Sequence, residues 1–213
     1  MLRIAFAIVL CVLSSLPAQA TSRGNFREGY QALLRRDYDK AIEYLTRAIE
    51  IGDLSRGNQA LAYHYRGALY LKRERNDDAI QDLDRALALN PRLATAYSDR
   101  GIAHRRKGQY EFAIADYTEA IRLWPEWHDW YVHRGIAFSA IGRHNEAIAD
   151  YGSALSLRPN LVSALVARGD AHLATGESAS AIADFRRAMT LDRDLAVNYP
   201  SVVEKLARLN AAP

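Results

Sequence analysis

Residues 94–127 read ATAYSDRGIAHRRKGQYEFAIADYTEAIRLWPEW, and the small residues of this stretch recur through the rest of the chain. Gly101 lies midway between Gly67 and Gly135, and Ala113 and Ala120 are repeated at the same interval. A fixed period of about 34 residues indicates an array of structural repeats. The recurring glycines are Gly29, Gly67, Gly101, Gly135 and Gly169, which are evenly spaced except that the first interval is four positions longer than the others.

Each glycine is followed by two alanines that lie seven residues, or two helical turns, apart. Small residues let two helices approach closely, and the glycine gives one of them a depression. A large residue four positions after the first alanine can fill that space. The alanine pairs are Ala41 and Ala48, Ala79 and Ala86, Ala113 and Ala120, Ala147 and Ala154, and Ala181 and Ala188, and the large residues are Leu45, Leu83, Tyr117, Tyr151 and Phe185. Every repeat is therefore predicted to be a pair of antiparallel helices.

Glycine and proline mark the ends of the predicted helices. Gly108, Gly142 and Gly176 fall where a left-handed residue would end a first helix, whereas the first two repeats have Arg36 and Glu74 there. Pro91, Pro125 and Pro159 follow the second helices of three repeats. The predicted repeats span residues 22–55, 60–93, 94–127, 128–161 and 162–195. Four extra residues between Gly52 and Asn58 are predicted to lengthen the first connection.

This pattern resembles the tetratricopeptide repeat family, whose signature of small residues, tyrosine, an aromatic residue and a closing proline is clearest in residues 94–127. The resemblance implies an all-α fold, a right-handed superhelical solenoid of five antiparallel helix hairpins over residues 21–195. Residues 196–213 are expected to form a C-terminal capping helix and tail, with Ser201 and Glu204 as a capping box. An amphipathic partner-binding helix is the alternative for this segment.

The first twenty residues have the pattern of a secretory signal peptide. Arg3 precedes an uncharged apolar run, and Ala18-Gln19-Ala20 supplies a cleavage site. The alternative is an uncleaved anchor, which would be the protein's one membrane contact. Cys11, the only cysteine, lies in the apolar run, so the mature chain is expected to have no thiol. We predict an exported protein, located in the periplasm or, alternatively, secreted.

Composition argues against several classes of function. Without Arg3 the chain has 27 basic and 25 acidic residues, a weak positive charge for a nucleic-acid-binding protein. The six histidines show no helical spacing that would place two metal ligands on one face. Phosphate-binding glycine loops and nucleophile motifs are also missing from the sequence. We therefore expect no catalytic residues, no metal, no cofactor and no nucleic-acid partner.

An arginine precedes four of the repeat glycines, and an aspartate stands sixteen residues after each arginine. The pairs are Arg66 and Asp82, Arg100 and Asp116, Arg134 and Asp150, and Arg168 and Asp184. We predict a structural ladder of surface ion pairs, each contributing at most about 1 kcal/mol, that fixes how repeats stack. Contact between these arginines and a ligand is the alternative.

The family resemblance implies a concave groove lined by the first helix of each repeat. The residues that fall on this face are Phe26, Tyr30, Leu33, His64, Ala68, Leu71, Ser98, Ile102, Arg105, Val132, His133, Ile136, Ser139, Val166, Asp170 and Leu173. Their largely apolar character favours an extended peptide or a helix. Cytosolic relatives bind acidic tails with lysine, asparagine and arginine, whereas the matching positions offer Phe26, Tyr30, Tyr65, Thr95 and Asp99. Neighbouring chains covering the groove are the alternative.

All three tryptophans lie within seven residues, at the junction of the third and fourth repeats. We interpret Trp130 as a packing residue and Trp127, with Trp124, as an anchor that docks a partner. The sequence as a whole favours a non-enzymatic scaffold or adaptor that binds a peptide or protein segment outside the cytoplasm. The alternative is a self-assembling structural subunit of an envelope complex, which would be a homo-oligomer.

Overall fold

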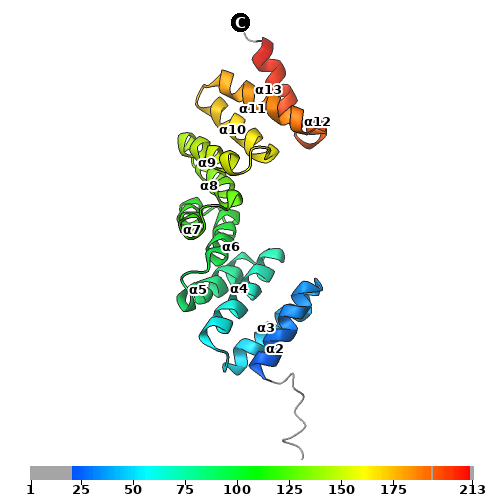
Figure 1. The fold of residues 1–213 in the computed structure, drawn as a ribbon, viewed down its shortest axis with the longest axis vertical. Coiled ribbons are helices and arrows are strands. Elements are labelled where there is room, and N and C mark those ends of the chain that lie inside the picture. The colour runs from blue at the N-terminus through cyan, green and yellow to red at the C-terminus, as the bar shows by residue number, and fades with distance from the viewer. Residues whose placement is uncertain (1–20, 193, 212–213) are drawn as a thin grey trace, which may run out of the picture. The chain divides into compact units, whose positions relative to one another are not determined.

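A computed structural model describes residues 21–192 and 194–211, and every regular element in these ranges is an α-helix (Figure 1). The all-α fold predicted from the sequence is confirmed. The predicted signal peptide, residues 1–20, lies outside the described residues. No helix of the described ranges has both the length and the hydropathy needed to cross a membrane.

Over residues 21–192 and 194–211 the helices follow one another as five hairpins and a C-terminal pair. Within each hairpin the first helix ends in a tight turn and the second helix runs back along it. The hairpins are α2 (Ser22–Leu34) with α3 (Tyr38–Ile51), α4 (Arg56–Lys72) with α5 (Asn76–Leu89), α6 (Ala94–Arg106) with α7 (Tyr110–Leu123), α8 (His128–Ala140) with α9 (His144–Leu157), and α10 (Val162–Ala174) with α11 (Ser178–Leu191). The chain divides into two compact units between Asp99 and Arg100, within α6.

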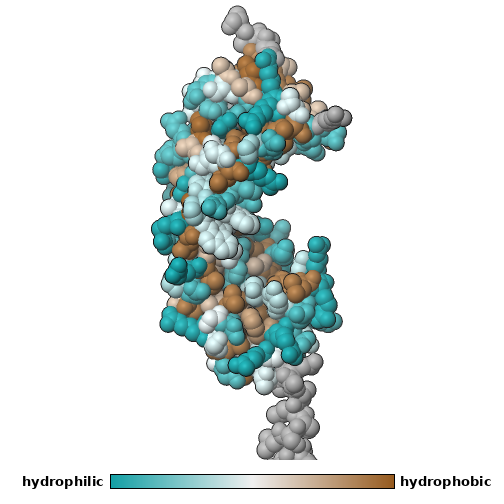
Figure 2. Space-filling view, in the orientation of Figure 1, coloured by the Kyte–Doolittle hydropathy of each residue, from teal (hydrophilic) through white to brown (hydrophobic). Residues whose placement is uncertain are grey.

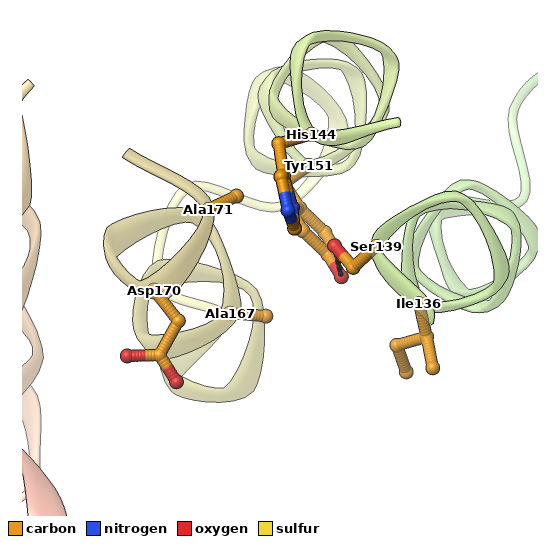
Figure 3. A pocket seen from close by; sticks show the side chains of 7 residues that line it. All are labelled: Ile136, Ser139, His144, Tyr151, Ala167, Asp170 and Ala171. Carbon is orange, nitrogen blue, oxygen red and sulfur yellow. Dashed lines mark hydrogen bonds between the residues drawn. The ribbon is translucent and has the colours of Figure 1, made fainter. Parts of the chain in front are cut away.

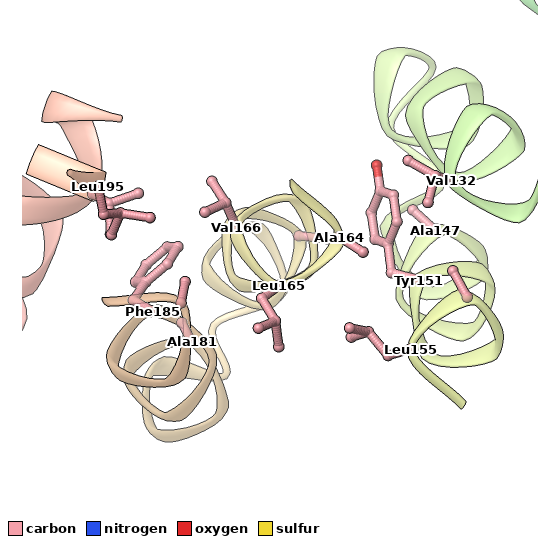
Figure 4. Packing of buried hydrophobic residues seen from close by; sticks show 14 of the residues in the cluster. Val132, Ala147, Tyr151, Leu155, Ala164, Leu165, Val166, Ala181, Phe185 and Leu195 are labelled. Carbon is pink, nitrogen blue, oxygen red and sulfur yellow. The ribbon is translucent and has the colours of Figure 1, made fainter. Parts of the chain in front are cut away.

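The recurring glycines lie where the two helices of a hairpin come closest. A Cβ atom placed on Gly135 would lie 2.7 Å from the Tyr151 ring, and one on Gly169 would lie 2.5 Å from the Phe185 ring. Both rings are buried between helices, beside alanines such as Ala181 (Figure 4). The same contact joins Gly29 to Leu45, Gly67 to Leu83 and Gly101 to Tyr117. The predicted pairing of a glycine with a large residue therefore holds in all five hairpins.

The turns inside the hairpins are left-handed at one residue, as predicted. Gly108, Gly142 and Gly176 have φ angles of 72°, 78° and 82°. Arg36 and Glu74 adopt the same conformation, with φ angles of 61° and 58°. A side chain makes this conformation about 1 to 2 kcal/mol less favourable, so the first two turns keep the geometry of the other three at some cost in stability.

The four extra residues near the start of the second repeat do not lengthen the first connection, contrary to the prediction. They extend α4, which has 17 residues whereas α2, α6, α8 and α10 have 13. The connection before α4 stays short, with Gly52 left-handed and the Ser55 side chain accepting a hydrogen bond from the Asn58 amide. Because four residues make about one helical turn, α4 presents the same face as the other first helices.

The C-terminal segment forms a short helix, α12 (Leu195–Asn198), and a longer one, α13 (Pro200–Ala211). The predicted capping box is wrong because α13 begins at Pro200, whose fixed φ suits a first helical turn, and Ser201 lies inside the helix. Val202 and Leu206 of α13 are buried in the same apolar cluster as Phe185. The helix thereby covers the apolar face of the last hairpin.

Candidate functional site

Each ladder arginine contacts the aspartate sixteen residues after it. The shortest nitrogen–oxygen distances are 2.7 Å for Arg66 and Asp82, 2.6 Å for Arg100 and Asp116, 2.7 Å for Arg134 and Asp150, and 2.7 Å for Arg168 and Asp184. The carboxylates are only 6 to 8% exposed, so these are partly buried pairs, not the surface pairs that the sequence suggested. Their geometry therefore matters more to stability than that of an exposed pair.

Two of the arginines also reach the preceding repeat. Arg66 donates to the Thr46 hydroxyl at 3.0 Å, and Arg134 donates to the Thr118 hydroxyl at 2.9 Å. The hydrogen bond to Asp184 raises the pKa of Arg168 above its ordinary value, which keeps that guanidinium charged. These contacts hold neighbouring hairpins together and direct the arginines into the protein, away from a ligand.

Replacing Asp150 with alanine removes the carboxylate from a partly buried guanidinium. We expect Asp150→Ala to lower the free energy of unfolding by about 2 to 3 kcal/mol, since a hydrogen-bonded charge loses its partner. Urea unfolding followed by circular dichroism measures the loss. The control is Glu119→Ala, which breaks the exposed pair with Arg122 and should cost less than about 1 kcal/mol. Equal losses in the two variants would contradict a structural role for the ladder.

In the N-terminal compact unit, three aromatic residues form a cluster on the face assigned to the groove. The Tyr65 ring of α4 lies 6.3 Å from that of Phe26 and 5.5 Å from that of Tyr30, both in α2. Tyr30 is 37% exposed, and Phe26 and Tyr65 are half-buried. We call these three residues the aromatic platform. Burial and then the neighbouring Tyr30 raise the pKa of Tyr65, so its hydroxyl stays protonated and can donate a hydrogen bond.

Five residues predicted to line the groove are buried instead, namely His64, Leu71, Ser98, Val132 and Val166. His64, Ser98 and Val132 are 9%, 6% and 8% exposed. His64 Nε2 lies 2.9 Å from an Asp99 carboxylate oxygen, so this histidine joins α4 to α6. A helical period read from one repeat assigns residues to a face, but it does not show which of them are buried in the folded chain.

Other predicted groove residues are at least partly accessible. Ala68, Ile102, Arg105, His133, Ile136 and Asp170 are half-buried. Burial, and then the positive charge of Arg105, lower the pKa of His133, so this histidine is neutral at pH 7. Leu71 and Val166, in contrast, are buried and do not reach the face.

A small pocket of about 210 Å³ lies beside the first helices of the C-terminal compact unit (Figure 3). Its lining includes Ile136 and Ser139 from α8, Tyr151 from α9, and Ala167 and Asp170 from α10. The Ser139 and Tyr151 hydroxyls lie 3.4 Å apart. Burial raises the pKa of Tyr151, which therefore keeps its proton. The pocket brings together the predicted groove residues Ile136 and Asp170 and adds Tyr151, which the sequence indicated only as a packing residue.

Asp170 already has a partner within the chain. Lys205 of α13 contacts its carboxylate at 2.6 Å, and the Lys205 ammonium lies 6.0 Å from the Phe185 ring centre. The C-terminal helix therefore reaches the side of α10 that was assigned to the groove. Asp170 acts as a contact for this helix and is less available to a separate ligand.

The tryptophans form a cluster at the connection between α7 and α8. The three ring centres lie 6.0 to 6.4 Å apart. Trp130 is buried, as the packing interpretation expected, whereas Trp124 and Trp127 are 57% and 50% exposed. The Tyr131 hydroxyl donates to the Pro125 carbonyl oxygen at 3.0 Å and holds the connection.

Two histidines lie close to polar residues that are near them in sequence. His104 Nδ1 is at hydrogen-bonding distance, 2.9 Å, from the Gln109 side-chain oxygen, and His172 Nδ1 lies 3.0 Å from a Glu177 carboxylate oxygen. Within the described parts of the chain, no three histidine, cysteine, aspartate or glutamate side chains are grouped in a way that could hold a metal ion.

Comparison with known families matches the repeats directly. Residues 67–108 and 135–176 match a family described as TPR repeat, and residues 94–126 and 162–195 match families described as tetratricopeptide repeat. Together with the five hairpins and their glycine contacts, these matches define the class of protein. The chain belongs to the tetratricopeptide repeat family.

One curated relative is the peptidyl-prolyl cis-trans isomerase CYP7 of Saccharomyces cerevisiae, 43% identical over 54 residues. The match covers 25% of this chain and only 14% of the isomerase. Among solved structures, a crystal structure of MamA protein is 23% identical, with a TM-score of 0.74 over 84% of this chain and 95% of its own. MamA from Desulfovibrio magneticus RS-1 is 18% identical, with a TM-score of 0.74 over 81% and 96%. These structures share the fold.

Proposed function

We propose that this protein is a non-enzymatic scaffold that holds a polypeptide segment on the groove face of its first helices. The observation that carries the proposal is the aromatic platform, which leaves three uncharged aromatic rings on this face where a peptide can lie. Figure 2 shows hydrophobic residues interrupting the hydrophilic surface of both compact units.

The platform favours apolar or proline-containing segments. The Phe26 and Tyr65 rings are nearly parallel, with an angle of 19° between them, and their centres lie 6.3 Å apart. Flat aromatic surfaces bind proline and aliphatic side chains, and the tyrosine hydroxyls can donate to the carbonyl groups of an extended peptide. The platform itself carries no charge, so binding should depend only weakly on salt.

The pocket in the C-terminal compact unit offers a second contact of similar chemistry. Ile136, Ala167 and Ala171 supply apolar walls, and the Ser139 and Tyr151 hydroxyls supply hydrogen-bonding groups. A volume of about 210 Å³ is large enough for a single side chain rather than for a whole metabolite. This size supports recognition of a polypeptide, one side chain at a time.

The groove proposal is tested with two charge-introducing variants of the mature chain. Tyr30→Asp and Ile136→Glu should each weaken binding of a crosslinked and purified partner by about tenfold, because a buried charge would replace an apolar contact. Isothermal titration calorimetry measures the dissociation constants.

The matched control is Ala149→Glu, which adds the same charge to an exposed position of α9, a second helix. It should leave the affinity unchanged. Unaltered affinity in both groove variants, with circular dichroism spectra like those of the wild type, would rule out the groove face as the binding surface.

We also propose that the scaffold acts outside the cytoplasm, in the periplasm or secreted. The signal-like pattern of residues 1–20 supports this location, and cleavage after Ala20 would remove Cys11. The protein recovered from cells should therefore begin at Thr21 and fail to react with a maleimide. An Ala20→Arg variant, which should block cleavage, would retain a reactive thiol and serve as the positive control. A full-length, maleimide-reactive wild-type protein in the cytoplasm would contradict export.

A further inference from the structure

We propose that Trp124, Glu126 and Trp127 form a binding site for a cationic side chain, arginine or lysine, carried by a partner polypeptide. The site lies at the connection between α7 and α8, away from the middle of the first helices that carry the groove face. The inference goes beyond the proposed function because it adds a second surface and specifies the charge of the group bound there.

The other connections show that packing does not require these tryptophans. The positions equivalent to Trp127 in the repeats before and after it hold Leu93 and Leu161, and those equivalent to Trp130 hold Ala96 and Ala164. Both alanines are fully buried. Trp130 is also buried, so its indole ring occupies a position where the neighbouring repeats have only a methyl group. Trp127 is 50% exposed, whereas Leu93 and Leu161 at the equivalent positions are partly buried.

The arrangement of the rings leaves a preformed aromatic surface. Trp124 is stacked on buried Trp130 with an angle of 16° between the rings, and Trp127 is tilted by 38° from Trp130. A cavity of about 350 Å³ is lined by Trp124, Pro125, Glu126 and Trp127. The hydrogen bond from Tyr131 to Pro125 restrains the loop, so little ordering is needed when a ligand binds.

The charge of the site selects a cation. Glu126 is the only charged residue in the lining, and within the described ranges its carboxylate has no hydrogen-bond or ion-pair partner. The nearby Arg122, in contrast, pairs with Glu119 at 2.8 Å. Indole faces attract cations, and the aliphatic stem of arginine or lysine can lie on them while its head group reaches Glu126. An uncharged apolar ligand would remove water from the Glu126 carboxylate without offering it a hydrogen bond or an opposite charge, which is unfavourable.

Intrinsic fluorescence reports on this site alone, because the chain has three tryptophans and all of them lie here. The mature protein is titrated with a blocked glycine-rich hexapeptide that contains one arginine. A second peptide has citrulline, the neutral analogue, at the same place. We expect a saturable fluorescence change, with binding about threefold weaker or more for the citrulline peptide and for the Glu126→Gln variant. Trp127→Ala should abolish binding, measured by calorimetry, while its circular dichroism spectrum stays unchanged.

Three results would overturn the proposal. The first is equal affinity for the arginine and citrulline peptides, which would indicate an uncharged docking surface. The second is no response to either peptide. The third is a stable wild-type oligomer, seen by light scattering, that Trp127→Ala dissociates, since a second copy would then occupy the site. Ile136→Glu should bind the arginine peptide normally, which separates this test from that of the groove.

Discussion

The structure depends on the close contact between a glycine in each first helix and a large side chain sixteen residues later in the second helix. Only a glycine lets the rings of Tyr151 and Phe185 lie against the opposite backbone. In each ladder pair the arginine comes directly before the glycine, and the aspartate comes directly before the large residue. Arg134 and Asp150 therefore meet beside Gly135 and Tyr151. The helix contact thus brings the charges together and buries them, which makes the ion pair a consequence of the packing.

The same repeated packing determines what remains for binding. Within a hairpin the alanines and the large residues form the core, and His64 and Val132 of the first helices are buried as well. Two of the accessible features are irregular ones that most repeats do not share. The aromatic platform belongs to the first two hairpins, and the tryptophan cluster belongs to one connection. Specific binding by a repeat protein is therefore expected at positions where the repeats differ.

The sequence predicted the hairpins, the left-handed turns and the ion pairs because each of these depends on contacts at a fixed spacing. It failed where a result depends on the neighbouring repeat. The extra residues before Asn58 extend α4, since a full turn added to the helix preserves its packing face. Ser98 is buried, although the periodicity of its own repeat placed it on the groove face. Ser201 has the features of a helix cap, but Pro200 is better suited to begin α13.

The most direct test of this account is a double-mutant cycle between Gly169 and Phe185, evaluated from urea unfolding. Gly169→Ala alone should cost about 1 to 3 kcal/mol, because the new methyl group meets the Phe185 ring. In a Phe185→Ala background the same change should be neutral or stabilising. Gly152→Ala, a helical glycine with ordinary space around it, should be neutral or stabilising in both backgrounds. An equal cost of Gly169→Ala with and without the Phe185 ring would contradict the close contact on which the structure depends.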